Sequence, residues 1–194
     1  MSDNSLIQED SLQIGEHISK MQFGDHNLLL YSDINSLRTI YSSHSKQSLH
    51  SRNNAVIILY HYEIKASIVH ALQELDIAVD RHEADRSLII LDADEIICKP
   101  SIDNFLQYLK TLEGLAIKCG RNGIDVVIDM GSFRHLGKEQ ELLECERKFN
   151  AAFKDSKSSI LCCYHDKDIK ALAIAEDEIY QFHSKNYIVR EQQQ

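Results

Sequence analysis

The sequence predicts a three-layer α/β fold with a mainly parallel central sheet. Its strand candidates are continuous apolar runs, which are typical of strands buried on both faces, whereas half-buried strands alternate apolar and polar residues. Amphipathic helical segments separate these runs at regular intervals. Alternation of this kind indicates parallel strands joined by right-handed crossover helices that cover both faces of the sheet.

Five apolar runs are the predicted strands, and a short sixth strand is expected at 187–189. The five runs are 27–31, 55–60, 87–91, 124–129 and 159–164.

Helices are expected between the strands because apolar residues recur there at positions i, i+3, i+4 and i+7. The expected helices are 35–50, 63–75, 102–119, 138–153 and a C-terminal helix at 168–183. Pro100 suits the entry into the third of them. Residues 1–23 lie outside the repeating pattern, and we expect an N-terminal extension that forms a docking helix or a loose tail. The domain itself is predicted over 24–190, with a frayed tail at 191–194.

Composition indicates one packed soluble domain and excludes several functions. The chain has 194 residues, of which 43% are hydrophobic and 26% charged. Its net charge of -9 argues against nucleic acid and against an anionic membrane surface as partners. It contains no apolar run of the roughly 20 residues that a spanning helix needs, and its polar, acidic start is unlike a secretory signal. We therefore expect a cytoplasmic protein, and an odd number of cysteines without framework spacing predicts free, mostly buried thiols.

Candidate functional residues follow the strands, because ligands of open α/β sheets bind at the carboxyl ends of the strands. Polar and aromatic side chains recur at all five ends, in the segments 31–33, 60–63, 92–95, 129–132 and 164–166. An alternative explanation is structural. Asp and Ser residues at these points often cap the next helix, which would account for Asp33 and Asp92 without a function.

Several catalytic and binding motifs are absent from the sequence. The segment 31–37 after the first strand has no glycine and no lysine, so it offers no cradle for phosphate. The ten histidines form no HExxH motif, and no CxxC pair occurs. Cys162 and Cys163 would point to opposite faces of a strand, so they do not make a ligand pair, and we predict no metal site. No activated serine or cysteine nucleophile is evident.

Four segments in order resemble the MEDS domain, a sensory domain named after methanogen and methylotroph proteins and the DcmR regulator. Gly24-Asp25-His26 and the strand to Tyr31 resemble the family's opening segment. The segment SLIILDADE at 87–95 is similar to a second motif, and CERKFN at 145–150 to a third. The segment LCCYH at 161–165 resembles its "LCAYP" strand. The likeness covers about residues 24–190.

This family in turn resembles a RecA-like ATPase core of the KaiC type that has lost its phosphate loop. In that topology the fifth predicted strand lies between the first and the fourth. The resemblance places Glu63 near the catalytic carboxylate of such a core and Asp129 at its Walker-B position. Without the loop, these carboxylates have no phosphate or magnesium ion to serve. The resemblance therefore implies a non-catalytic sensory or regulatory domain, which in some members is attached to kinase or DNA-binding modules.

The leading hypothesis is a sensor that binds a small molecule or a partner segment in one crevice and signals by protein contact. The residues expected at this crevice are His26, Tyr31, Asp33, His61, Glu63, Asp129, Tyr164 and His165. Two alternatives remain open: an interaction module with a collapsed pocket, and a residual enzyme that uses Glu63 and Asp129. No cofactor is expected. An unidentified small molecule or signalling protein is the expected partner, and a homodimer is the expected assembly.

Overall fold

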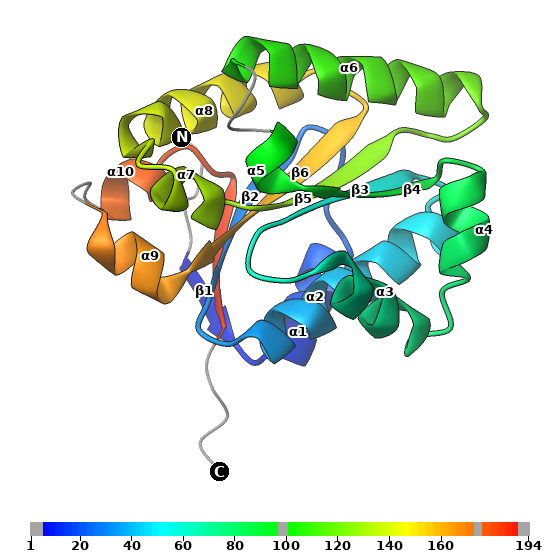
Figure 1. The fold of residues 1–194 in the computed structure, drawn as a ribbon, viewed down its shortest axis with the longest axis horizontal. Helices are drawn as coiled ribbons and strands as arrows, with labels where there is room; N and C mark the ends of the chain where they lie inside the picture. The colour runs from blue at the N-terminus through cyan, green and yellow to red at the C-terminus, as the bar shows by residue number, and fades with distance from the viewer. Residues whose placement is uncertain (1–5, 97–100, 173–175, 190–194) are drawn as a thin grey trace.

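Seven parallel strands form a single sheet in the computed structural model, which describes residues 6–96, 101–172 and 176–189 (Figure 1). The strand order is β1-β7-β2-β6-β5-β3-β4. The strands are β1 (Leu6–Glu9), β2 (His26–Tyr31), β3 (Ala55–Tyr60), β4 (Leu88–Asp92), β5 (Ile124–Asp129), β6 (Ser158–His165) and β7 (Lys185–Val189).

Helices cover both faces of the sheet, which gives the three layers that the sequence predicts (Figure 1). The first face carries α1 (Ser11–Ile18), α2 (Ile34–Lys46) with the π-helical turn η1 (Gln47–Ser51), α3 (Lys65–Gln73) and α4 (Val79–Ala84). The longest helices of the second face are α6 (Ile102–Lys118) and α8 (Glu139–Phe153). Shorter segments complete the helices: α5 (Ala93–Ile96), α7 (Gly131–His135), α9 (Asp166–Ala171) and α10 (Glu176–Tyr180).

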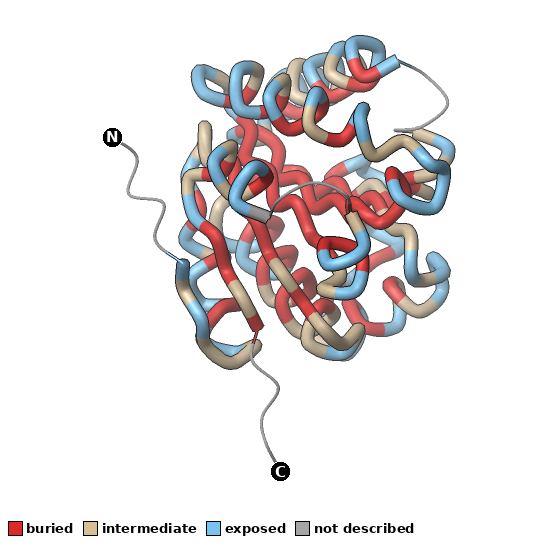
Figure 2. The backbone as a smooth tube through the Cα atoms, turned by 90° about the vertical axis from the view of Figure 1, so that its left-hand side faces the viewer, coloured by how far each residue is buried: buried red, intermediate tan, exposed pale blue. Residues whose placement is uncertain are grey.

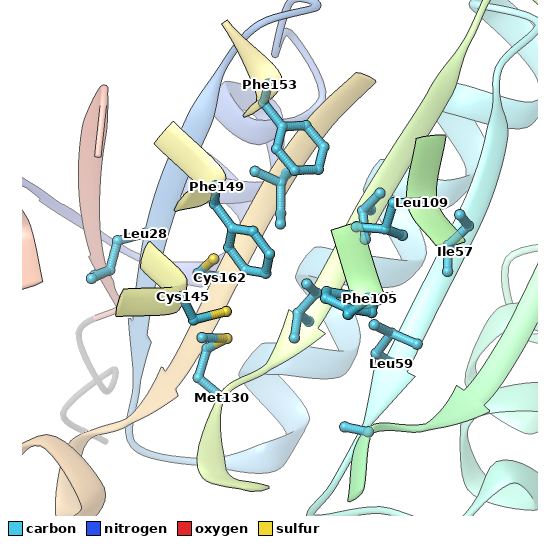
Figure 3. Close-up of a cluster of buried hydrophobic side chains, with 14 of the residues drawn as sticks. Leu28, Ile57, Leu59, Phe105, Leu109, Met130, Cys145, Phe149, Phe153 and Cys162 are labelled. Atoms are coloured by element: carbon cyan, nitrogen blue, oxygen red, sulfur yellow. The ribbon is translucent and has the colours of Figure 1, made fainter. Parts of the chain in front are cut away.

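Two apolar cores lie on the two faces of the sheet, because successive side chains of each strand point to opposite faces. Phe105 of α6 and Phe149 of α8 pack against the second face (Figure 3). Ile14 of α1 and Ile40 of α2 pack against the first face. The strands are accordingly the most buried part of the backbone (Figure 2). This explains why the predicted strands are apolar at nearly every position.

The predicted strands, including the short one near 187–189, are confirmed, and β6 lies between β2 and β5 as expected. The single helix predicted at 168–183 is wrong, because the described residues hold two short helices there, α9 and α10. Residues 173–175 between them lie outside the described residues, as do Cys98, Pro100 and the tail predicted at 191–194. No helix of the described part of the chain is long and apolar enough to cross a membrane.

Of the two alternatives expected for residues 1–23, the described part holds the docking helix, α1, together with a strand that was not expected. Leu6–Glu9 is a strand, β1, which pairs with β7 at the edge of the sheet. Helix α1 begins with a capping box at Asp10, whose carboxylate accepts the amide hydrogens of Leu12 and Gln13. The segment was missed because strand β1 is half-exposed and has only four residues, too few for a pattern.

If α1 is part of the core, Ile14→Ala should destabilise the protein by about 2–5 kcal/mol, because it removes a fully buried side chain. Leu12→Ala is the matched control. Leu12 lies on the same helix but is 67% exposed, and its truncation should change stability by less than about 0.5 kcal/mol. Denaturant unfolding of both variants measures the difference. Equal, small effects of the two substitutions would show that α1 is a loose tail.

Candidate functional site

A cleft of about 710 Å³ lies where β2, β3 and β6 end, at the carboxyl edge of the sheet. This is the position at which parallel α/β sheets bind ligands. The side chains around it come from the segments that follow these strands, from α2 and α3, and from α7. The lining residues are Ile34, Arg38, His61, Tyr62, Glu63, Ile64, Ser67, Arg134, His165, Lys167 and Asp168.

Asp129, the last residue of β5, lies beneath this cleft. Its Oδ2 accepts the Tyr31 hydroxyl and the backbone N–H of Tyr62, both at 3.3 Å, and its Oδ1 accepts the Gly131 N–H at 3.0 Å. Burial raises the pKa of Asp129 to about 6, although the Gly131 and Tyr62 amides act in the opposite direction. The carboxylate therefore joins the ends of β2 and β5 to the segment that precedes α3.

The segment with His61 and Tyr62, which precedes α3, lies close to the start of α7 because residue 131 is a glycine. A Cβ atom there would lie 2.6 Å from the Tyr62 ring and 2.8 Å from the His61 ring. Because glycine lacks that atom, the His61 and Tyr62 side chains pack directly against the start of α7. The space beside Asp129 is thereby filled by protein, and only a void of about 20 Å³ remains between Asp129, Glu63 and Tyr41.

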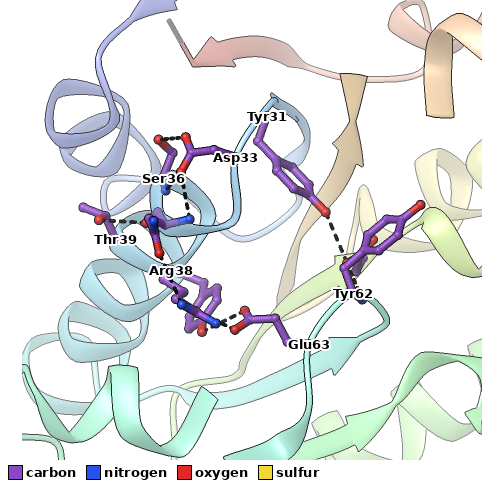
Figure 4. A network of polar contacts seen from close by, with 10 residues as sticks. Tyr31, Asp33, Ser36, Arg38, Thr39, Tyr62 and Glu63 are labelled. Carbon is purple, nitrogen blue, oxygen red and sulfur yellow. Dashed lines mark hydrogen bonds and ion pairs between the residues drawn. The ribbon is translucent and has the colours of Figure 1, made fainter. Parts of the chain in front are cut away.

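Glu63 is held by two partners (Figure 4). Arg38 Nε donates to Glu63 Oε2 at 2.6 Å, and the Tyr41 hydroxyl donates to Oε1 at 3.1 Å. The Glu63 side chain is only 5% exposed. Both carboxylate oxygens thus have partners, and the contacts fix the segment before α3 against α2.

The opposite side of the cleft is formed by Tyr62, Asp168 and Arg134. The Tyr62 hydroxyl donates to Asp168 Oδ2 at 2.5 Å, and Arg134 Nη1 donates to Asp168 Oδ1 at 2.7 Å. Burial and the bond to Asp168 raise the pKa of Tyr62, so the phenol stays protonated near neutral pH. The Tyr62 ring itself remains 46% exposed in the cleft.

Two histidines complete the lining. The His165 ring lies between Tyr31 and Tyr62, with ring centroids 5.2 and 5.6 Å away. His165 Nδ1 accepts the N–H of Lys167 at 3.1 Å, so in the neutral ring the proton is on Nε2. His61 Nδ1 lies 2.9 Å from Asp94 Oδ1, which orients that ring.

The loop between β2 and α2, at the place of a phosphate loop, holds a carboxylate. Asp33 caps α2: its Oδ1 accepts the N–H groups of Asn35 at 2.9 Å and Ser36 at 3.0 Å (Figure 4). The Ser36 hydroxyl donates to Oδ2 at 2.5 Å. These bonds outweigh burial and lower the pKa of Asp33. The helix N-terminus, a common phosphate-binding position, is therefore already paired with an acidic side chain.

Three of the eight residues expected at the crevice, His61, Glu63 and His165, line the cleft. Tyr31 and Asp129 lie beneath it, and Asp33 caps α2, as its structural alternative predicted. The remaining two, His26 and Tyr164, lie elsewhere in the fold.

His26 and Tyr164 do not lie at the cleft. His26 is at the start of β2, the amino end of the strand, and Tyr164 faces the second core, on the face opposite Tyr31. The error has a simple geometric cause. A strand of six residues separates its two ends by about 17–20 Å, and alternate side chains of a strand point to opposite faces.

Both residues belong instead to a buried cluster around Glu146 of α8. His26 Nε2 is 2.9 Å from Glu146 Oε2, and the Tyr164 hydroxyl donates to Oε1. His183 and Cys162 also belong to this cluster. One ligand atom from each of His26, Glu146, Cys162 and His183 lies within 4.8 Å of the others, and of the described residues these four could together hold a metal ion.

Eight of the eleven lining residues were not among those predicted for the crevice, and five of these are charged or aromatic: Arg38, Tyr62, Arg134, Lys167 and Asp168. Of these five, only Tyr62 lies in one of the segments predicted at the strand ends, 60–63. Arg134 and Asp168 lie within or near helical patterns, where a charged residue is usually solvated. Their pairing across α7 and α9 is a tertiary contact that leaves no local signal.

The fold and site define an α/β domain of the KaiC-like type in which the place of the phosphate loop carries a carboxylate. A KaiC-like protein from the hyperthermophilic archaeon Pyrococcus horikoshii has a similar structure, with a TM-score of 0.56 and 14% sequence identity. The match covers 74% of this chain and 62% of that one. At this identity the likeness shows the fold alone. None of the curated protein sequences matches the chain.

The chain belongs to the MEDS family, the methanogen/methylotroph, DcmR sensory domain, whose family model matches residues 25–183. This confirms the resemblance recognised in the four sequence segments. A sensory or regulatory role follows from the family.

The raised pKa of Asp129 makes stability depend on pH. A carboxyl whose pKa is higher in the folded state stabilises the fold most when protonated, so its contribution is present below about pH 4 and lost as the pH rises through about 6. A pKa raised from 3.8 to about 6 corresponds to about 3 kcal/mol. The stability of Asp129→Asn relative to wild type should therefore rise by up to this amount between pH 4 and 7.

Urea unfolding of both proteins at several pH values measures this difference. Asp33→Asn is the control: the pKa of Asp33 is lowered, so the stability from its ionised form is lost mainly below about pH 4, and its relative stability should stay nearly constant from pH 4 to 7. A difference between Asp129→Asn and wild type that stays constant from pH 4 to 7 would contradict the prediction.

Proposed function

We propose that this chain is a non-catalytic sensory domain that binds a small anionic molecule in the cleft above Asp129 and signals by contact with another protein. The observation that carries the proposal is the cleft itself. Its volume of about 710 Å³ suits a small molecule. It is lined by three cationic side chains, in a chain whose net charge is -9.

The charges of the cleft favour an anion. Glu63 is paired with Arg38, and Asp168 is paired with Arg134, so both acidic groups are already neutralised. Lys167 is exposed at the same cleft, and its ammonium group makes no ion pair within the described residues. An anion there would contact Lys167 and the outer side of Arg134, while the exposed Tyr62 ring offers an apolar surface beside them.

A partner segment is the second candidate occupant of the cleft. Ile64 at its rim is 67% exposed, and Tyr62 is 46% exposed. Exposed apolar side chains beside a cleft are a common feature of protein interaction sites. With a partner segment in the cleft, the sensory role stays the same and the ligand is a peptide. Thermal shift with small anions separates a small-molecule ligand from a peptide ligand.

ATP hydrolysis is not part of the proposed function. The N–H groups at the start of α2 are capped by Asp33, and Asp129 is enclosed by Tyr31, Tyr62 and Gly131. A nucleotide phosphate at this position would meet two carboxylates and no lysine. These contacts support a KaiC-like fold without nucleotide chemistry.

The ligand class can be tested by thermal shift with short carboxylates and phosphate, each paired with a neutral alcohol of the same size. A ligand at 100 times its dissociation constant adds about 2.7 kcal/mol, which should raise the melting temperature by roughly 5–10 °C. Lys167→Ala should remove most of this shift. Lys170→Ala, on the same helix and paired with Asp166, should retain it.

A shift with neutral but not anionic compounds would contradict the anionic ligand. If no small molecule shifts the melting temperature and a partner protein binds in a manner lost on Ile64→Asp, the cleft is a protein-docking site instead.

ATP binding can be tested by calorimetry with Mg²⁺. We expect no saturable heat at micromolar ATP and no phosphate release above background, because the phosphate position is already paired with Asp33. Asp33→Gly provides a useful comparison, since it removes the carboxylate from the helix N-terminus. Micromolar affinity for ATP in the wild-type protein would overturn this part of the proposal.

A further inference from the structure

A second group of chemically reactive side chains lies in the core, away from the cleft. His26 begins β2, Glu146 lies on α8, Cys162 is in β6, and His183 lies between α10 and β7. All four residues are at most 1% exposed. Glu146 Oε2 is 2.9 Å from His26 Nε2, 3.1 Å from His183 Nε2 and 3.7 Å from Cys162 Sγ, and Sγ is 3.4 Å from His26 Nε2.

The hydrogen bond of His183 Nδ1 determines what its other ring nitrogen, Nε2, presents to the Glu146 carboxylate. His183 Nδ1 is 2.9 Å from the carbonyl oxygen of Ile179, and a carbonyl can only accept, so Nδ1 must carry a hydrogen. A neutral His183 ring then has a bare lone pair on Nε2. That atom is buried, has no hydrogen-bond partner among the described residues, and faces the Glu146 carboxylate.

Two acceptors in contact inside a dry core repel each other unless a positive charge lies between them. A proton on His183 would supply one charge and leave Cys162 as a neutral thiol that donates to the carboxylate. A divalent cation would also supply positive charge, and it would bind all four side chains at once, with Cys162 as a thiolate.

The geometry matches the second arrangement. Metal–ligand bonds of about 2.0–2.3 Å in a tetrahedral site imply separations of about 3.3–3.8 Å between the ligand atoms. Four of the six separations are 2.9 to 3.7 Å, and all four atoms lie within 4.8 Å of one another, so side-chain adjustments of about 1 Å would meet this range. Two nitrogens, one sulfur and one oxygen form a donor set that favours zinc or a similar transition metal over magnesium or calcium.

The surrounding contacts also resemble those of metal sites. The Ile179 carbonyl fixes the tautomer of His183 so that Nε2 points inward, and the Tyr164 hydroxyl donates to the outer oxygen of Glu146. Such outer contacts orient metal ligands in proteins. Phe149 packs edge-on against His26, with ring centroids 5.9 Å apart, and lies beside Cys162 in the core, so the site is dry (Figure 3).

We propose that His26, Glu146, Cys162 and His183 form a four-coordinate site for a thiophilic divalent transition metal, with Zn²⁺ as its probe. The ion would join α8 and the segment after α10 to the centre of the sheet. It would also hold β6 a few residues before His165, which lines the cleft. The site is independent of the small-molecule proposal, since it shares no residue with the cleft.

The test is metal loading of the full chain during refolding, because the site is closed in the folded protein. We expect about one retained Zn²⁺ per chain by elemental analysis, and a higher melting temperature than in the presence of chelator. With Co²⁺ the protein should show the intense visible absorption of a tetrahedral site and a thiolate-to-cobalt charge-transfer band. Mg²⁺ and Ca²⁺ should have no effect.

Cys162→Ser should abolish the charge-transfer band and the retained zinc. Cys163→Ser is the matched control: it changes the adjacent buried cysteine of the same strand, which faces the other core, and should leave both signals intact. Circular dichroism checks that each variant folds. If Cys162→Ser does not fold, Glu146→Gln, which keeps the side-chain shape, should weaken zinc retention at least 10-fold.

A wild-type protein that folds equally well in chelator and retains neither ion would overturn the proposal. So would loss of the cobalt spectrum in Cys163→Ser with retention in Cys162→Ser, since the metal would then be bound elsewhere.

Discussion

A charged group buried inside this domain needs partners within the protein, because helices cover both faces of its parallel sheet. Two buried carboxylates show the consequence. Asp129 gathers hydrogen-bond donors from β2, from the segment before α3 and from α7. Glu146 gathers His26, His183 and Tyr164 on the opposite face. Burying each carboxylate costs desolvation free energy, and the contacts that offset this cost link elements that are far apart in the sequence.

The same constraint closes the inner end of the sheet. A parallel sheet of this order presents the ends of its central strands to one edge, where ligands of open α/β sheets bind. Here Asp33 caps α2 with its own carboxylate, and Tyr31 and Tyr62 enclose Asp129. The inner position is therefore filled by protein, and the open cleft lies further out, over Tyr62 and His165.

Strand β6 lies between the two sites and contributes to both. Its register against β2 and β5 places Cys162 and Tyr164 on the face of α8, and it ends at His165 in the cleft. Glu146 of α8 accepts the Tyr164 hydroxyl, and Tyr164 is followed directly in β6 by His165, so one hydrogen bond and one peptide unit link the buried cluster to the cleft.

Periodicity in the sequence was sufficient to determine the strands β2 to β6, the long helices and the three-layer class, because those patterns record which faces are buried. Four motifs identified the family, and the cap at Asp33, the structural alternative to its assignment to the crevice, follows from local chemistry. Other features depended on contacts between distant segments. The edge strand β1 has only four residues and is defined by its partner β7. His26 and Tyr164 carried no local sign that they face Glu146, and Arg134 none that it pairs with Asp168. Sequence patterns report burial and local hydrogen bonding, but which polar side chains meet is set by the order of the strands and by the packing of α8 and α9, and only the tertiary structure decides it.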